Sequence, residues 1–191
     1  MCYKMEEKKK ILVTPFLKGV RVDLCPTNAE NAEKYALWVN NPEGRLYARN
    51  PLPSSIEELK KKYGPPGEGM PEEISFEIFH KEDKKPIGLT GFLHINWLNR
   101  NANLFINIGE IEYWGYGLAE EVAKLVIQYG FEELNFHKIF TNVFAPNERS
   151  LKLAKKIGFI HECTLKEEIF VNGEYVDREK YALFKRDWLN K

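Results

Sequence analysis

Apolar and less apolar residues alternate with a period of two through the middle of the chain, which is typical of strands with one buried face. The alternation is clearest at Ile74, Phe76 and Ile78, and it returns over residues 87–96 and 104–108. Polar, turn-forming residues separate the three segments. The pattern therefore predicts an antiparallel meander.

The N-terminal part alternates between a strand pattern and helix patterns. Residues 20–25 predict a strand with one face buried. Thr27 with Glu30, and later Ser55 with Glu58, form the spacing of a capping box, which predicts a helix after each. We expect the first helix to end at the Asn-Asn-Pro sequence and the second before a loop rich in Gly and Pro.

The C-terminal part predicts a parallel crossover followed by a hairpin. An amphipathic helix is expected from residue 118 to about 135, a strand over 139–144, and a second helix over 147–158. A strand, helix and strand in this order favour a right-handed parallel crossover. Residues 163–171 and 175–184 are expected to pair as a hairpin, because an Asn-Gly pair joins them.

Composition narrows the class of protein. The 191 residues carry 28 basic and 28 acidic side chains, so no overall field favours nucleic acid or an anionic membrane. No apolar run approaches a membrane span, and the charged N-terminus does not resemble a secretory signal. Cys2, Cys25 and Cys163 lack metal-ligand spacing, so no metal site is expected. We expect one domain over 1–191, with a flexible tail at 1–10, in the cytoplasm.

A glycine-rich segment leads from the last meander strand into the long helix. Gly115 and Gly117 allow the backbone to approach a ligand, and they stand just before the helix start at Leu118. The unpaired N–H groups of a helix N-terminus favour an anion such as a phosphate. Because an ordinary turn also uses glycine, this spacing alone leaves a structural turn equally open.

Five segments in this order resemble the GNAT superfamily of acetyl-CoA-dependent N-acetyltransferases, and within it the RimJ/RimL branch. They are residues 19–26, 97–102, 114–120, 147–150 and 156–159. The resemblance extends over almost the whole chain. It implies a mixed α/β (α+β) fold with a mostly antiparallel central sheet, one splayed parallel strand pair, and flanking helices.

The same resemblance implies acetyl-CoA as cosubstrate, with its pantetheine arm lying like an added strand between the two splayed strands. Such an arm would satisfy backbone groups that the splaying leaves unpaired. Its pyrophosphate would lie on main-chain amides at the helix start. The cofactor-binding residues implied are Ile108, Trp114, Gly115, Tyr116, Gly117, Leu118, Ala119 and Asn147.

Acetyl transfer to an amine requires a base, an oxyanion donor and a proton for the leaving thiolate. A backbone N–H near Ile108 is expected to serve the oxyanion, and Glu110 and Glu77 are candidates for the base. Either carboxylate could instead be an ordinary solvated surface acid. The position where many family members carry a proton-donating tyrosine is Ala154, so Ser150 or water is left to protonate the thiolate. Ser150 could equally be a residue that only bonds the nearby backbone.

The resemblance implies direct attack of the amine in a ternary complex. The acceptor is left open between a protein N-terminal α-amine and a small amine such as a polyamine, amino sugar or antibiotic, because fold does not fix substrate. The absent tyrosine keeps a second hypothesis, a catalytically silent CoA-binding sensor or interaction module. A dinucleotide-binding domain is disfavoured, because the glycines follow a meander and not a first strand. Homodimerisation also stays open.

Overall fold

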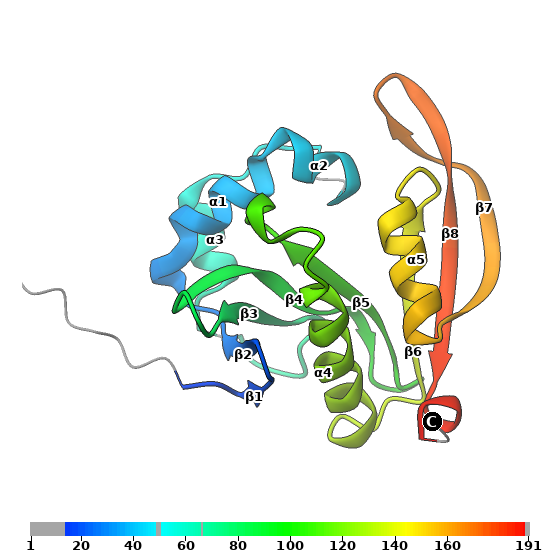
Figure 1. Cartoon of the computed structure of the whole chain (residues 1–191), viewed down its shortest axis with the longest axis horizontal. Helices are drawn as coiled ribbons and strands as arrows, with labels where there is room; N and C mark the ends of the chain where they lie inside the picture. The colour runs from blue at the N-terminus through cyan, green and yellow to red at the C-terminus, as the bar shows by residue number, and fades with distance from the viewer. Residues whose placement is uncertain (1–13, 49–50, 66, 190–191) are drawn as a thin grey trace, which may run out of the picture.

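A computed structural model of the chain describes residues 14–48, 51–65 and 67–189 (Figure 1). The tail expected at residues 1–10 lies outside these ranges. The strands are β1 (Leu17–Lys18), β2 (Val22–Pro26), β3 (Ile74–His80), β4 (Lys85–Asn96), β5 (Asn101–Ile108), β6 (Lys138–Phe144), β7 (Ile160–Val171) and β8 (Glu174–Phe184). The helices are α1 (Ala32–Asn40), α2 (Pro42–Ala48), α3 (Ile56–Lys62), α4 (Leu118–Glu132), α5 (Glu148–Ile157) and α6 (Lys185–Leu189), with 3-10 turns η1 (Ala29–Asn31) and η2 (Ile111–Tyr113).

The eight strands form one sheet in the order β1-β2-β3-β4-β5-β6-β8-β7. Neighbours from β1 to β5 pair antiparallel, and β3, β4 and β5 form the meander that the sequence pattern predicts. The pair β5 and β6 is parallel, and α4 forms the crossover between them. The fold class predicted from the sequence is therefore confirmed.

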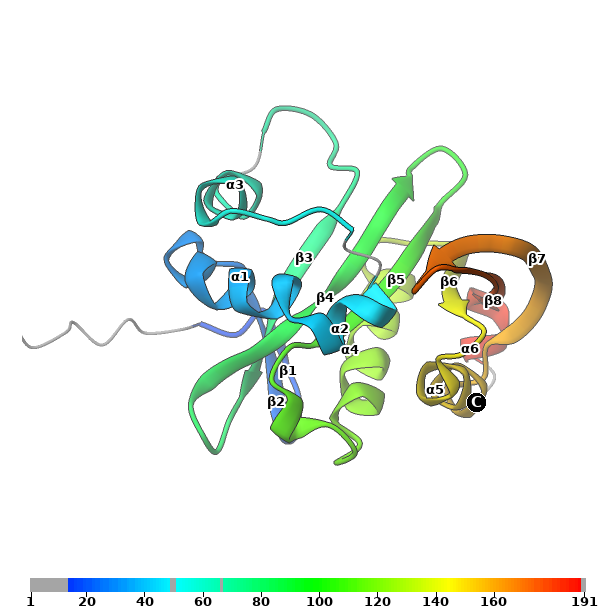
Figure 2. The same cartoon turned by 90° about the horizontal axis from the view of Figure 1, so that it is seen from above.

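Helices cover both faces of the sheet (Figure 2). Helix α4 packs its buried Val122 and Val126 against one face, in a core that includes Ile78 and Phe92. On the opposite face α1 and α3 enclose a smaller cluster, built from Ala32, Tyr35, Trp38, Leu59, Tyr63 and Leu89. The central strands are thus buried on two sides, and their ends become the places where a ligand can be reached.

Most of the expected helix ends and turns are present. Ser55 and Glu58 form both bonds of the predicted capping box. Gly158 ends α5 with φ of 101°, and the Asn172-Gly173 turn has φ values of 52° and 86°, as the hairpin requires.

Two expectations about the N-terminal part are wrong. Asn28 and not Thr27 begins the first helical turn, because its side chain accepts a hydrogen bond of 3.0 Å from the Glu30 N–H. Strand β2 is buried on both faces, since Val22 and Leu24 lie in the main core and Asp23 and Cys25 on the opposite face are buried too. Cys25 lies opposite Glu77, whose carboxylate bonds Tyr35 of α1. The sequence pattern also did not predict the short helices α2 and α6. None of the helices in the described ranges is long and apolar enough to span a bilayer.

Candidate functional site

The parallel strands β5 and β6 are paired over only part of their length. Their register runs from Asn101 opposite Lys138 to Asn103 opposite Phe140, while β5 continues to Ile108. The Gly109 N–H bonds the Ile87 carbonyl on β4 at 2.9 Å, so alternation along the strand turns the backbone groups of Ile108 toward β6. The C-terminal end of β5 therefore presents an edge that no neighbouring strand pairs, hereafter the unpaired edge, although a side chain can still bond it.

The glycine segment lies directly beyond this edge and opens α4. Gly115 and Gly117 have φ values of 86° and 75°, in the left-handed region that favours glycine. Gly117 is the N-cap of α4 and has no side chain with which to bond the first-turn N–H groups. A Cβ added at Gly115 would have nothing within 4 Å, so the space in front of the loop is open. This arrangement suits a phosphate group at the helix N-terminus.

Trp114 connects the loop to the strand edge. Its indole N–H donates to the Ile108 carbonyl at 2.7 Å, and the guanidinium carbon of Arg149 lies 5.7 Å from the centre of the ring. Trp114, Ile108 and the first turn of α5 are thus brought together. The sequence predicted Trp114 and Ile108 as site residues, but it gave no signal that Arg149 lies over the Trp114 indole.

Helix α5 begins beside this edge. The Asn147 side chain accepts a hydrogen bond of 3.1 Å from the Ser150 N–H, so this asparagine caps the helix as expected. Its contact with a cofactor stays a prediction. Ala154, at the position where many family members carry a tyrosine, is buried in the core, and Ser150 or water stays the predicted proton donor.

Glu110 lies two residues beyond the end of β5, where the indole N–H of Trp38 donates to its carboxylate at 3.0 Å. Trp38 also packs on Gly109, where an added Cβ would lie 2.2 Å from the indole ring. The N–H groups of Gly109 and Glu110 both bond the Ile87 carbonyl, at 2.9 and 3.1 Å. The Ile108 N–H, on the other side of the strand, is therefore the remaining backbone donor in this segment.

Comparison with known protein families shows to which family this chain belongs. The Acetyltransferase (GNAT) domain family matches residues 21–160, which is well over half of the chain. The chain belongs to the GNAT acetyltransferase family. Several of its relatives carry the name of spermidine N-acetyltransferases, and the finer RimJ/RimL resemblance stays a prediction.

Three similar proteins illustrate this GNAT relationship. Spermidine N(1)-acetyltransferase of Escherichia coli (strain K12) is 36% identical over 107 residues, covering 56% of this chain and 57% of the relative. A putative ribosomal N-acetyltransferase of Bacillus subtilis (strain 168) is 30% identical over 101 residues, covering 53% of this chain and 55% of the relative. The chain therefore spans little more than half the length of these curated relatives.

The third is the crystal structure of spermidine N-acetyltransferase from Vibrio cholerae in complex with CoA and spermine. It superimposes with a TM-score of 0.79 and 27% identity, over 89% of this chain and 99% of that chain. The structural likeness therefore covers more of this chain than the sequence match to the Escherichia coli relative does.

Glu77, the other base candidate of this GNAT domain, lies inside the protein. Only 2% of it is exposed, so its interpretation as a solvated surface acid is wrong. One carboxylate oxygen accepts hydrogen bonds from the Asn31 amide at 2.6 Å and from the Tyr35 hydroxyl. Burial, and then the bond to Glu77, raise the pKa of Tyr35, so this hydroxyl keeps its proton. The arrangement gives Glu77 a role in holding α1 on the sheet, and its catalytic role stays a prediction.

Proposed function

We propose that this GNAT domain transfers the acetyl group of acetyl-CoA to a primary amine of a polyamine-class acceptor. The observation that carries the proposal is the unpaired end of β5 next to a glycine loop that opens α4. Similarity to the spermidine N-acetyltransferases supports the choice of acceptor.

The residues present fit acetyl-CoA, which when bound supplies the activated acetyl thioester. Backbone N–H groups from Gly115 to Ala119 would hold the diphosphate, since the two glycines leave space in front of the helix start. The side chain of Leu118 is buried in the core, so this residue contributes only through its backbone. The Tyr116 side chain is exposed, so we take this residue to shape the loop through its backbone.

The amine arrives as an ammonium ion and must lose a proton before it can attack. Glu110 follows the last residue of the unpaired edge by two positions, and Trp38 holds its carboxylate by one hydrogen bond. In this proposal Glu110 accepts the proton, directly or through a water, and the Ile108 N–H stabilises the developing oxyanion. Ser150 or water then protonates the leaving thiolate, whose low basicity requires no strong acid.

A second acceptor class, the N-terminal α-amine of a protein, is favoured by the similarity to a putative ribosomal N-acetyltransferase. The test is thiol release from acetyl-CoA in the presence of spermidine, spermine and a short peptide with a free N-terminus. We expect release with the polyamines. Release with the peptide alone would replace the polyamine by the peptide as acceptor.

The same experiment, combined with calorimetry, separates the enzyme from a catalytically silent module. An enzyme binds CoA and releases thiol with at least one amine. Tight CoA binding without thiol release on any amine would instead favour a sensor or interaction role. Absence of CoA binding would contradict both hypotheses.

A further inference from the structure

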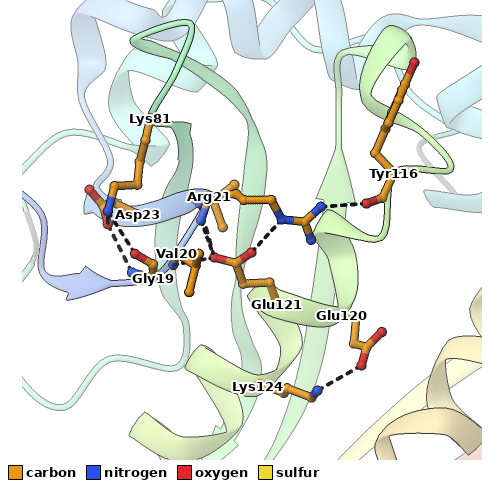
Figure 3. A network of polar contacts seen from close by, with 10 residues as sticks. Gly19, Val20, Arg21, Asp23, Lys81, Tyr116, Glu120, Glu121 and Lys124 are labelled. Carbon is orange, nitrogen blue, oxygen red and sulfur yellow. Dashed lines mark hydrogen bonds and ion pairs between the residues drawn. The ribbon is translucent and has the colours of Figure 1, made fainter.

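The turn before β2 meets the first turn of α4, although about a hundred residues separate them (Figure 3). One carboxylate oxygen of Glu121 accepts backbone hydrogen bonds from Val20 at 2.7 Å, Arg21 at 2.8 Å and Val22 at 3.3 Å. A single side chain of α4 thus satisfies three consecutive N–H groups of the turn. This links the start of the long helix to the N-terminal strand.

The Arg21 side chain completes the connection on the other side. Its Nε donates to the second Glu121 oxygen at 3.1 Å, and its Nη1 donates to the Tyr116 carbonyl at 2.8 Å. Figure 3 shows the guanidinium lying between the helix carboxylate and the loop backbone. Tyr116 stands between Gly115 and Gly117, the two residues with the greatest backbone freedom in the loop. A restraint at this carbonyl therefore limits the conformations of the whole segment.

The turn itself is firmly held, so it can act as an anchor. The Gly19 N–H donates to Asp23 at 3.1 Å, and the Lys81 ammonium donates to the Gly19 carbonyl at 2.9 Å. A Cβ at Gly19 would lie 2.7 Å from the Glu121 carboxylate and 2.3 Å from the Val22 carbonyl. The close approach of turn and helix thus depends on glycine.

The Glu121 carboxylate that faces Arg21 keeps its negative charge at neutral pH. Burial alone would raise the pKa of Glu121, but hydrogen bonds from the backbone of Arg21 and Val22 and from the Arg21 side chain outweigh it and lower the pKa overall. The Arg21 side chain is 47% exposed, and its Nη2 lies 3.9 Å from the position of a Cβ at Gly117. A fixed positive charge therefore stands beside the loop as well as a hydrogen-bond donor.

We propose that Arg21 and Glu121 are positioning residues that hold the loop 115–117 in the conformation that binds a diphosphate. This inference rests on the proposed function, because it concerns the same cofactor. Arg21 acts through the Tyr116 carbonyl and through its charge. Glu121 acts by fixing the direction of the guanidinium and the distance between turn and helix.

The test measures CoA binding by calorimetry for the wild type, Arg21→Met, Arg21→Lys and Arg186→Met. We expect Arg21→Met to weaken CoA binding about tenfold, because the loop loses the charge-assisted hydrogen bond that restrains the Tyr116 carbonyl. The CoA affinity of Arg21→Lys should lie between those of the wild type and Arg21→Met. The lysine ammonium keeps the charge, but it cannot bond Glu121 and Tyr116 at once as the planar guanidinium does. Arg186 lies in α6, with its charge paired to Asp187, and its replacement should leave CoA binding unchanged.

Pantetheine, which lacks the diphosphate, separates positioning from general damage to the fold. As a competitive inhibitor against acetyl-CoA it should act equally on the wild type and on Arg21→Met. In turnover, KM for acetyl-CoA should rise while kcat and KM for the amine stay near wild type. The proposal is overturned if Arg21→Met binds CoA like the wild type, or if it loses affinity for pantetheine to the same extent. Failure of the wild type to bind CoA would instead overturn the proposed function.

Discussion

Trp38 donates its indole N–H to the Glu110 carboxylate across 3.0 Å, and so joins α1 to the segment that follows β5. Gly109 makes the approach possible, because any side chain there would collide with the indole ring. A helix on one face of the sheet thus fixes a carboxylate at the end of the central strand. Trp38 therefore positions Glu110 in addition to packing in the smaller cluster between α1 and α3.

Replacing Trp38 by Phe tests this link. A smaller aromatic ring replaces the indole and the N–H donor is lost, so Glu110 is no longer held in one orientation. We expect kcat to fall about tenfold, comparable to the loss of one hydrogen bond to a charged group. Trp97→Phe is the matched control, since it removes an indole bond of 2.8 Å to the Pro71 carbonyl, between two residues that lie outside the strands. Equal losses in both variants would contradict a specific role for Trp38.

Glu110→Gln and Glu77→Gln separate the two base candidates. Loss of a general base lowers turnover about a hundredfold or more, and we expect this for Glu110→Gln with CoA affinity retained. Glu77→Gln should chiefly lower the free energy of unfolding, by about 1–3 kcal/mol, because it disturbs a buried hydrogen-bonded carboxylate. Turnover and thermal unfolding are measured on both variants. A Glu77→Gln protein of normal stability that has lost turnover would transfer the role of base to Glu77.

Gly117→Val tests the diphosphate loop. Valine is strained at φ of 75°, and its side chain would occupy the space in front of the helix start. We expect weaker CoA binding in calorimetry together with a modest loss of stability. Gly173→Val places the same side chain at φ of 86° in the open hairpin turn, where it should cost stability without affecting CoA. Unchanged CoA affinity in Gly117→Val would argue against this location of the diphosphate.

Local pattern was sufficient for most of the fold. Period-two alternation identified the meander, the Ser55–Glu58 spacing identified a helix start, and the Asn172-Gly173 pair identified the hairpin. Each of these signals lies within a few residues, so the chain carries it before any tertiary contact forms. The glycine loop was found for the same reason.

Contacts between distant segments were not predictable in this way. Trp38 and Glu110 are 72 residues apart, and Arg21 and Glu121 are 100 apart, so no spacing reveals either pair. The burial of Glu77 depends on α1 covering a second face of the sheet. A strand pattern reports alternation, but it does not say whether the more polar face will meet water or another helix.

The cysteines provide a prediction about burial. Burial, with smaller contributions from Glu77 and Asp23, raises the pKa of Cys25 to about 12, whereas Cys163 is exposed. Because the thiolate is the reactive form, iodoacetamide at pH 8 should modify Cys163 and leave Cys25 unmodified in the folded protein. Peptide mass spectrometry with and without denaturant measures both sites. Rapid native labelling of Cys25 would mean that the protein opens readily around β2.

The Arg21–Glu121 pair also predicts how stability depends on pH. The pKa of Glu121 is lower in the folded state than in the unfolded chain, so the unfolded state binds more protons when the medium is acidified. Its contribution is therefore fully present above about pH 4.3, the usual glutamate pKa, and is lost as the pH falls through the folded value. We expect the stability difference between wild type and Glu121→Gln, measured by denaturant unfolding, to be largest near neutrality and to shrink below that pH. Glu174→Gln, at an exposed position of the hairpin, serves as the control. A difference that stays constant down to pH 3 would show that the Glu121 charge does not stabilise the connection between turn and helix.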